Sequence, residues 1–567
     1  MVQEKNDLCA AELWTGREAA AADRYTMGTL GMDSAVLVER ASLCVSAHVE
    51  AILSLTDDLC RVMVLCGSGN NGADGLAVAR QLHGRGYMVE AVCVTDGAGE
   101  MAARQRAWAQ SHGVTVLSAL PEHPSDSVLV VDALLGTGSR GAPRGAILAA
   151  IGWILETDWV VSIDLPTGVN PDDGTCPGDA VTAASTVTFE RSKVGLHVGV
   201  GREQAGRVHV AEIGLELTPD QPTQTAELID PRRLFRIGRG PTVGHLGVEF
   251  LTQTARHKGE RGHVGLIAGS PGSCGAAILA GAAALRMGAG VVTIVAADRA
   301  AEETATHALL RSRPEVMVEV RAIRGHGKPL DGSLAAAADV LVVGPGLRDL
   351  DAWPELGELY LDDSRPAVWD ASALDAIPLG AGRDQLAAVG SRRILTPHPG
   401  EAARLLTRIA DIESSRSGGG AEDTEWSSVR VQASRLEVVR RLARFTGATV
   451  ILKGAGSLVV SSVSGSDLSP VAVDIFGSSA LATAGTGDVL AGLLGALLSL
   501  SVRGGRGETL HALAMAGLVF HGLAGREAAR QGQVLAMDVA SALRRVRGAL
   551  AESMGVGSVE WPLRIKG

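Results

Sequence analysis

Two glycine-containing strings in the second half of the sequence carry residues that could act on phosphate. A predicted strand ends in Lys453, Gly454, Ala455 and Gly456. The string GTGD then leads into a predicted helix and consists of Gly485, Thr486, Gly487 and Asp488. The first N–H groups of a helix lack partners within it and can hold a phosphate. Asp488 stands where it could take a proton from an attacking hydroxyl. An aspartate that merely caps the helix is the alternative, but the two strings together favour phosphoryl transfer.

A histidine lies between two prolines in the string LTPHPGE. His398 follows a predicted strand and precedes a predicted helix that begins near Glu401. A lone histidine is often only a packed or surface residue. Here the prolines restrict its loop at the carboxyl end of a strand, so we predict a substrate contact.

The first half contains a glycine-rich loop, GSGNNGADG, directly after a predicted strand. Gly67, Gly69 and Gly72 match the GxGxxG pattern of dinucleotide-binding loops, and Asp96 lies where a ribose-binding acid is expected. Asp74 is electrostatically odd beside a pyrophosphate, because both groups are negative. Amide and carboxylate oxygens suit a hard cation instead. A dinucleotide loop, a different phosphate or ion loop, and a purely structural turn therefore all remain open at this point.

Two further strand ends carry polar side chains. Asp132 ends a predicted strand and is followed by a second GxGxxG pattern, formed by Gly136, Gly138 and Gly141. The string VSIDLPTG then places Asp164 and Thr167 after another strand. Asp164 alone would most simply be a turn or cap residue. Ligands bind beyond the carboxyl ends of strands in open α/β sheets, so these segments are predicted to form the walls of one crevice.

Strands alternating with helical patterns in both halves predict two mainly parallel sheets. The strands of the first half are expected at Arg61–Gly67, Tyr87–Val94, Ser127–Ala133, Trp159–Leu165, Thr186–Glu190 and Arg207–Ile213. Those of the second half are expected at His263–Gly269, Gly290–Val295, Asp339–Gly344, Pro366–Asp370, Arg392–Pro397 and Thr449–Gly454. The stretch Leu217–Gly262 suits a connector, and we place a domain boundary near residue 240, giving domains 1–240 and 241–567. The polar stretch Glu413–Glu425 is predicted to be a surface insertion.

The composition limits the class of protein. The length of 567 residues exceeds what one hydrophobic core usually supports, so two large domains are expected. A net charge of −11 argues against nucleic-acid binding. Seven cysteines without CxxC spacing suit a reduced cytoplasmic protein. The mixed charge at the N-terminus and the absence of an apolar run of membrane-spanning length predict neither secretion nor membrane insertion.

The motifs of the first half, in their order along the chain, resemble the signature of the NAD(P)H-hydrate epimerase family. They are GSGNNGADG, VDALLGTG, DLPTG and TFERSKVG, preceded by a stretch similar to the family's N-terminal helix pair, AADRYTMGTLGMDSAVLVERAS. The resemblance implies a Rossmann-like three-layer α/β/α domain. It also implies a potassium ion held by Asn71, Asp132 and Thr167.

The same resemblance implies the other site residues of the first half. Asp164 would be the acid or base, tuned by Lys193, although an exposed lysine is an equal alternative for Lys193. Substrate contacts carry over to Asn70, Asn71, Gly72, Ala73, Asp74, Gly136, Thr137, Gly138, Ser139, Arg140, Gly141, Ala142 and Asp164. Three positions depart from the family pattern: Ser42 and Ala73 replace glycines, and Thr167 replaces a more frequent serine.

The motifs of the second half resemble the ADP/ATP-dependent NAD(P)H-hydrate dehydratases, which have a ribokinase-like fold. They are HKGERG, RPEVMV, VVGPGL, LTPHPGE, LKGAG and AGTGDVLAG, over roughly residues 255–545. The resemblance implies ADP as co-substrate, Mg²⁺ at its phosphates and Asp488 as the base. Nucleotide contacts carry over to Lys453, Gly454, Ala455, Gly456, Gly485, Thr486 and Gly487, and substrate contacts to Ala276, Gly346 and His398. Ser372 replaces the second acid of the family's DADAL string.

Together the resemblances imply a bifunctional enzyme of nicotinamide nucleotide repair. It would interconvert the R and S hydrates of NADH and NADPH (NADHX and NADPHX) and dehydrate the S form with ADP, giving AMP and phosphate. A homo-oligomer without nucleic-acid or membrane partners is expected. The alternatives are a ribokinase-like vitamin or sugar kinase fused to an unrelated domain, and a non-enzymatic protein or RNA scaffold.

Overall fold

The chain folds into two compact units, Met1–Leu228 and Ile229–Gly567, called unit 1 and unit 2 below. The computed structural model describes residues 12–56, 59–95, 97–125, 127–218, 226–236, 246–247, 257–296, 317–320, 334–348, 350, 355–417, 425–464, 467–505 and 507–553. Asp96, the expected ribose-binding acid, lies outside these residues. The α/β fold class expected for both halves is confirmed, and every expected strand has a counterpart.

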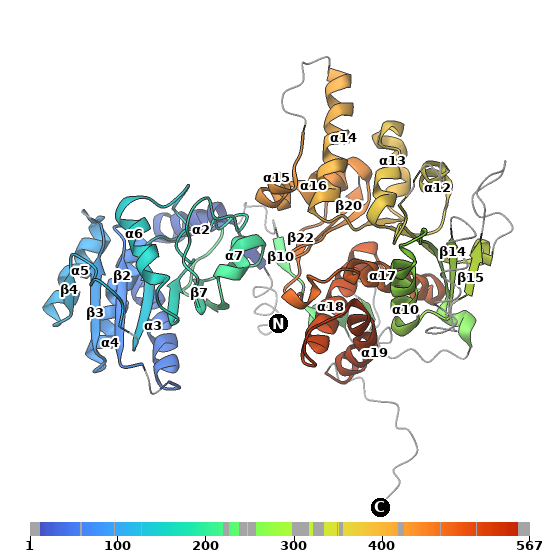
Figure 1. The fold of residues 1–567 in the computed structure, drawn as a ribbon. Coiled ribbons are helices and arrows are strands. Elements are labelled where there is room, and N and C mark those ends of the chain that lie inside the picture. Colours follow the sequence, from blue (N-terminus) through green and yellow to red (C-terminus); the bar gives the residue numbers. More distant parts are fainter. Residues whose placement is uncertain are drawn as a thin grey trace, which may run out of the picture. The chain divides into compact units, whose positions relative to one another are not determined.

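Unit 1 is a parallel sheet covered by helices on both faces (Figure 1). Its strands are ordered β4 (Thr115–Leu117), β3 (Val89–Cys93), β2 (Arg61–Cys66), β5 (Val128–Ala133), β6 (Val160–Ile163), β7 (Ser185–Phe189) and β9 (Arg207–Ala211). The order runs outward from β2 in one direction and from β5 in the other. The carboxyl ends of β2 and β5 are therefore the topological switch point, where open α/β sheets bind ligands.

Alternate residues of β2 explain the three layers of unit 1. Val62, Val64 and Cys66 point into one core, together with side chains of four helices: α2 (Gly16–Gly28), α3 (Ser34–Leu53), α4 (Asn70–Gly84) and α5 (Glu100–Ser111). Met63 and Leu65 point into the other core, against α6 (Gly145–Ile154). Because side chains alternate along a strand, a strand that is apolar throughout needs cover on both faces.

Unit 2 is a second layered unit around a mixed sheet. Its strands are ordered β15 (Met317–Val320), β14 (Val291–Ala296), β13 (His263–Ile267), β16 (Val340–Val343), β17 (Ala367–Trp369), β18 (Arg393–Leu395), β19 (Thr449–Leu452), β20 (Leu458–Ser464) and β22 (Val471–Val473). Neighbours from β15 to β19 are parallel, and β20 pairs antiparallel with β19 and β22. Figure 1 shows two groups of helices on opposite faces of this sheet. One group is α10 (Cys274–Met287), α17 (Thr486–Gly504), α18 (Leu510–Ala529) and α19 (Ala536–Ser553); the other is α12 (Leu356–Asp362), α13 (Arg383–Gly390), α14 (Pro399–Ser417), α15 (Ser428–Ala433) and α16 (Arg435–Thr446).

The structure corrects three expectations about segments. Glu413–Ser417, expected in the surface insertion, is the end of α14, and Glu413 pairs with Arg383 and Arg441 at 2.7 Å each. Part of the expected connector is not a linker, because Phe235 is fully buried in the core of unit 2. Among the helices of the described residues, α17 alone is long and apolar enough for a membrane span by length and composition. It is a core helix of unit 2, with most of its residues buried against α10 and the sheet.

Candidate active sites

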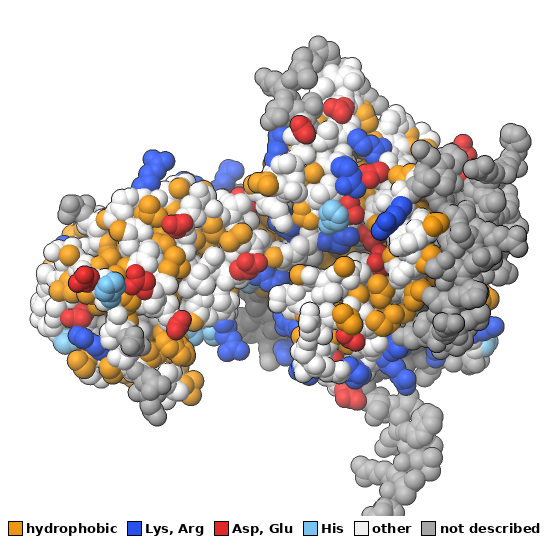
Figure 2. Space-filling model, viewed as in Figure 1, with side chains coloured by type: hydrophobic (Ala, Val, Ile, Leu, Met, Phe, Trp, Pro, Cys, Tyr) orange, Lys and Arg blue, Asp and Glu red, His pale blue; other side chains and the backbone are white. Residues whose placement is uncertain are grey.

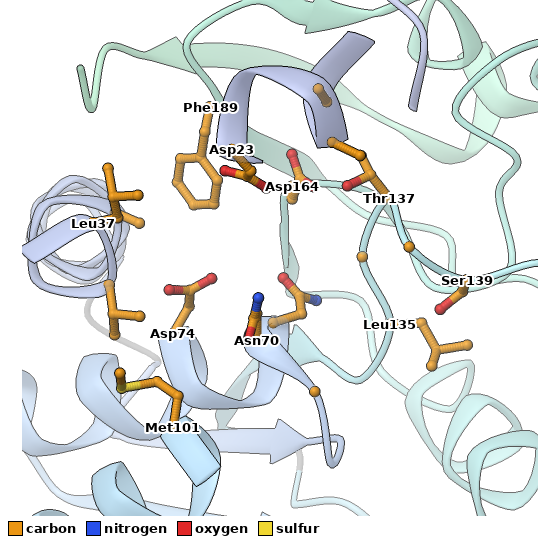
Figure 3. A pocket seen from close by; sticks show the side chains of 18 of the residues that line it. Asp23, Leu37, Asn70, Asp74, Met101, Leu135, Thr137, Ser139, Asp164 and Phe189 are labelled. Atoms are coloured by element: carbon orange, nitrogen blue, oxygen red, sulfur yellow. The ribbon is translucent and has the colours of Figure 1, made fainter. Parts of the chain in front are cut away.

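A cavity of about 510 Å³ opens at the switch point of unit 1. Its walls come from α2 and α3, the loops after β2 and β5, and the end of β6 (Figure 3). Two glycines allow this arrangement. A Cβ atom on Gly67 would lie 2.0 Å from the carbonyl oxygen of Leu134, and one on Gly72 would lie 1.9 Å from that of Gly67. The two loops can therefore approach only without side chains at these positions.

The start of α4 forms one side of the cavity. Gly69 is the N-cap residue and provides no side-chain hydrogen bond, and Asn70 and Asn71 occupy the first turn. The unpaired N–H groups of this terminus favour an anionic group. Asn70, Asn71 and Asp74 line the cavity, whereas Gly72 and Ala73 do not. Ala73 is instead fully buried in a small apolar cluster between α3, α4 and α5.

Asp164 follows β6 and forms an ion pair with Lys193 of β8 (Ser192–Lys193). The Lys193 ammonium donates hydrogen bonds to Asp164 Oδ1 at 2.7 Å, Thr188 Oγ1 at 2.9 Å and the Phe189 carbonyl at 3.0 Å. Only 2% of Lys193 is exposed, which excludes the alternative of an exposed lysine. Asp164 has a φ of +64°, a left-handed conformation that aspartate tolerates better than most residues. The backbone turn thus presents this carboxylate to the cavity with its charge already balanced.

Two more carboxylates face the same cavity, from Asp23 on α2 and Asp74 on α4 (Figure 3). Burial raises the pKa of Asp74 well above its ordinary value, and the negative charges of Asp164 and Asp23 raise it further. Burial also raises the pKa of Asp23, as does Asp164, although Lys193 and Arg24 oppose the shift. Among the residues that line this cavity, the Lys193 ammonium is therefore the one positive charge beside three carboxyl groups.

Asp132 and Thr167 lie behind the cavity wall rather than on it. The Asp132 carboxylate is fully buried and accepts hydrogen bonds from the Thr167 hydroxyl (2.7 Å), the Thr167 N–H (2.9 Å), the Ser162 hydroxyl (2.9 Å) and the Leu134 N–H (3.3 Å). Thr167 Oγ1 also accepts from the Leu135 N–H at 3.1 Å. The hydroxyl therefore connects Asp132 to the loop after β5.

The loop after β5 contributes only in part to the cavity. Gly136, Thr137, Gly138 and Ser139 line it. Arg140 and Gly141 line a separate hollow of about 40 Å³ nearby, and Ala142 lines neither. Ser42, where the family pattern has glycine, is buried between α3 and α4 and accepts a hydrogen bond from Gln81 at 2.7 Å. That departure therefore affects helix packing and not the cavity wall.

The candidate site of unit 2 surrounds Lys453, at the end of β19. Its ammonium donates to Asp370 Oδ1 at 2.7 Å and lies 3.7 Å from Glu401 Oε2. Burial would lower the pKa of Lys453, but Asp370, Glu401 and Asp488 outweigh it and raise this pKa. The sequence predicted that Lys453 touches nucleotide. In the structure its side chain lies among the carboxylates, so it balances their charge.

Asp488 stands in the first turn of α17, where the sequence placed it. Gly485 precedes this helix with a φ of +91°, and a Cβ atom there would lie 2.6 Å from Leu279 of α10. A Cβ atom on Gly487 would lie 3.5 Å from the Lys453 ammonium, so the GTGD and KGAG strings adjoin. Burial, together with the negative charges of Asp370 and Glu401, raises the pKa of Asp488 to about 7, although Lys453 opposes the shift. Asp488 therefore changes between acid and base near neutral pH.

A buried arginine supports the KGAG loop from behind. Arg435 is fully buried and donates to the carbonyl oxygens of Leu452 (3.3 Å), Lys453 (3.3 Å) and Gly456 (3.1 Å). A Cβ atom on Gly454 would lie 2.5 Å from Arg435 Nη1. Because one guanidinium binds carbonyl oxygens on both sides of the loop's turn, Arg435 fixes the bent conformation of the KGAG loop.

His398 and Glu401 belong to one turn at the start of α14. Glu401 Oε2 accepts from the His398 N–H at 2.7 Å, and Glu401 Oε1 lies 3.3 Å from His398 Nε2. The His398 side chain is 53% exposed, so it can meet a ligand. Acidic and basic side chains gather on the visible surface of unit 2 (Figure 2). The other two predicted substrate contacts, Ala276 and Gly346, adjoin each other, since a Cβ atom on Gly346 would lie 3.0 Å from Ala276 Cβ.

Sequence reasoning missed three acids of these sites: Asp23, Asp370 and Glu401. Asp23 follows four alanines in α2. An acid on an otherwise apolar helix face was the sequence signal that could have indicated a functional role. Asp370 was expected only as the last residue of a predicted strand, yet it is 2% exposed and binds Lys453. Glu401 was seen only as the beginning of a helix, yet it is 5% exposed and lies beside the same lysine.

Comparison with known proteins identifies the family. The family model described as NAD(P)H-hydrate dehydratase matches residues 264–547, and that of the YjeF-related protein N-terminus matches residues 34–195. The bifunctional NAD(P)H-hydrate repair enzyme Nnr of Escherichia coli is 32% identical over 550 residues, covering 94% of this chain and 93% of that one. The chain belongs to the bifunctional NAD(P)H-hydrate repair enzymes.

Two further similar proteins are a second bifunctional repair enzyme and a solved dehydratase. The Nnr enzyme of Moorella thermoacetica is 34% identical over 536 residues, covering 92% of this chain and 93% of that one. A solved ADP/ATP-dependent NAD(P)H-hydrate dehydratase from Bacillus subtilis, co-crystallised with ATP and Mg²⁺, is 24% identical. It covers 53% of this chain and 93% of its own, with a TM-score of 0.39.

The buried pair of Lys193 and Asp164 gives a prediction about stability. Lys193→Met leaves the Asp164 carboxylate without its cation and should lower the free energy of unfolding of unit 1 by about 3–5 kcal/mol. Adding Asp164→Asn removes the stranded charge, so the double variant should recover part of that loss. Urea denaturation of the four proteins in this double-mutant cycle measures it. If the losses of unfolding free energy of the two single variants add up in the double variant, the result would contradict the ion pair.

Proposed function

We propose that unit 1 epimerises the R and S hydrates of NADH and NADPH and that unit 2 dehydrates the S hydrate with ADP. Family membership along nearly the whole chain supports both activities. The observation that supports the first most directly is the cavity at the switch point, with Asp164 held by Lys193. The start of α4 offers N–H groups to the substrate's pyrophosphate.

For unit 2 we infer a two-stage reaction. Asp488 takes the proton of the C6 hydroxyl as its oxygen attacks the terminal phosphoryl group of ADP, forming an O–P bond and releasing AMP. Phosphate then leaves C6 with the electron pair of the C–O bond while the ring nitrogen's lone pair forms a C=N bond. The C5 proton passes to the departing phosphate, its bonding pair forms the C5–C6 double bond, and the C=N pair returns to nitrogen. Phosphate is a far better leaving group than hydroxide. Lys453 pairs with Asp370 and lies beside Glu401, and its charge reduces their repulsion of the incoming phosphates.

Magnesium would be held mainly by the nucleotide. The described residues contain no group of three or more His, Cys, Asp or Glu side chains that could hold a metal. Mg²⁺ commonly binds through one or two carboxylates together with substrate phosphates. Asp370 is the nearby acid that fits this role, and the ion would neutralise charge on the phosphates. The N–H groups beside Gly454, Ala455 and Gly487 would bind the nucleotide.

For unit 1 we propose a potassium ion near the segment from Leu134 to Gly136. Asp132 is buried, and the groups that donate hydrogen bonds to it are all neutral. Asn71 adjoins Gly136, and Thr167 binds the Leu135 N–H. Amide, hydroxyl and carboxylate oxygens fit a hard monovalent cation and would relieve the unbalanced charge of Asp132.

The potassium site has a test that does not use activity. Thermal unfolding of the whole chain in KCl should show a higher Tm for unit 1 than in choline chloride at equal ionic strength, because a ligand of the folded state stabilises it. Asp132→Asn should remove the difference. Equal Tm values for the wild type in the two salts would contradict the site.

Asp488 gives a prediction for the dehydratase. Asp488→Asn should lower the rate of NADPH formation from the S hydrate at saturating ADP by at least about 100-fold, while epimerisation continues. In the wild type the rate should rise through about pH 7, because the carboxylate is protonated and cannot act as base below that pKa. The exposed Asp411→Asn is the matched control. A wild-type rate in Asp488→Asn would remove Asp488 from the base role.

Asp164 gives a prediction for the coupled reaction. An R and S mixture with ADP should be converted in one continuous phase by the wild type. Asp164→Asn, which tolerates the positive φ, should convert only the S portion quickly, with the rest following at the uncatalysed epimerisation rate. Absorbance of the restored dihydronicotinamide at low enzyme concentration separates the phases. A single fast phase in the variant would favour a scaffold function for unit 1.

A compartment and an assembly are also part of the proposal. No disulfide joins the described cysteines, which fits a reducing cytoplasm. A homo-oligomer remains the expected assembly. A ribokinase-like kinase of a vitamin or sugar is disfavoured, because the chain matches the repair enzymes across both units.

A further inference from the structure

The cavity of unit 1 contains more acid groups than its lysine can neutralise. Lys193 directs its hydrogen bonds to Asp164, Thr188 and Phe189. Asp74 and Asp23 line the same cavity, and the structure gives neither of them an ion pair among the described residues. Near Asp74 the wall combines apolar side chains, Leu37 and Val38 from α3 and Met101 from α5, with the amide of Asn70. Lys193 thus balances the charge of Asp164, whereas the described structure gives Asp74 no ion-pair partner.

Epimerisation at C6 of the hydrate needs two proton transfers on opposite faces of the ring. The C6–O bond breaks with its electron pair on oxygen, which takes a proton and leaves as water, while the ring nitrogen's lone pair forms a C=N bond. Water then adds to the other face, loses a proton, and the C=N pair returns to nitrogen. One group must therefore arrive protonated and another ionised. The reverse reaction exchanges their roles.

The positions of the carboxylates match this requirement. Figure 3 shows Asp74, on α4, facing Asp164 across the cavity, with Asp23 on the same side as Asp164. We propose, on the basis of the epimerase function of unit 1, that Asp74 is the second proton-transfer residue, opposite Asp164. Asp23 acts through Asp74 as a positioning residue, because its negative charge keeps the proton on Asp74.

The electrostatics agree with this division of roles. Burial is the main cause that raises the pKa of Asp74, and Asp164 and Asp23 add to it. The other charged groups near the cavity are Lys193, bound to Asp164, and Arg24, which lowers the pKa of Asp23. Burial and two acidic neighbours thus favour the protonated form of Asp74, whereas Asp164 is held in an ion pair by Lys193.

The first test uses the full chain without ADP, so that only epimerisation is followed, by separating the R and S hydrates. Asp74→Asn should lower kcat by about 10²–10⁴-fold with a much smaller change in KM. Dehydration of pure S hydrate with ADP should be unchanged, which shows that the variant chain is made and active in unit 2. The exposed Asp158→Asn is the matched control and should leave both activities intact. Asp74→Asn with near wild-type kcat would overturn the proposal.

The second test uses Asp23→Asn, which removes a charge without touching Asp74. Loss of this anion lowers the pKa of Asp74, so the descending limb of the kcat profile should move to lower pH, and activity should recover as the pH is lowered. A purely structural role would lower kcat at every pH and leave the limb in place, which would overturn the role given to Asp23. A wild-type chain that does not interconvert the hydrates would instead overturn the proposed epimerase function.

Discussion

Both sites depend on one physical arrangement, a buried lysine whose ammonium lies among more carboxylates than its one charge can balance. In unit 1 the lysine is Lys193, bound to Asp164 at 2.7 Å. In unit 2 it is Lys453, bound to Asp370 at the same distance. A buried unpaired charge costs several kcal/mol, so each pair is what makes an anion tolerable at its sheet edge. The excess carboxylates then keep protons or titrate near neutrality, as acid–base chemistry requires.

The backbone around each site is held by contacts that do not touch a ligand. In unit 1 Glu190, with a φ of +61°, accepts hydrogen bonds from the N–H groups of Ile213, Gly214 and Leu215. Ile213 and Leu215 line the cavity, so this carboxylate positions part of its wall. In unit 2 Arg435 does the equivalent for the KGAG loop through three carbonyl oxygens. In both units a charged side chain fixes a loop whose small residues offer little side-chain packing of their own.

The two proposed activities suit one chain because the product of the first is the substrate of the second. Dehydration that accepts only the S hydrate would leave the R hydrate behind. An epimerase in the same chain removes that limit without any need for direct transfer between the sites, since the hydrates diffuse freely. The separate cores of the two units agree with separate active sites, each at the carboxyl ends of its own parallel strands.

The sequence by itself determined the strands, the parallel sheets and the places where glycine loops follow strands, because hydrophobic periodicity and glycine spacing are local properties. It also indicated Asp164 and Asp488, since both follow a strand or begin a helix within a distinctive string. Only the tertiary structure decided which acids share a lysine. Asp23 and Asp164 are far apart in sequence, as are Asp370 and Lys453, and no local pattern records such a meeting. The same holds for Asp132, whose burial behind the cavity follows from the closeness of two loops that glycine permits.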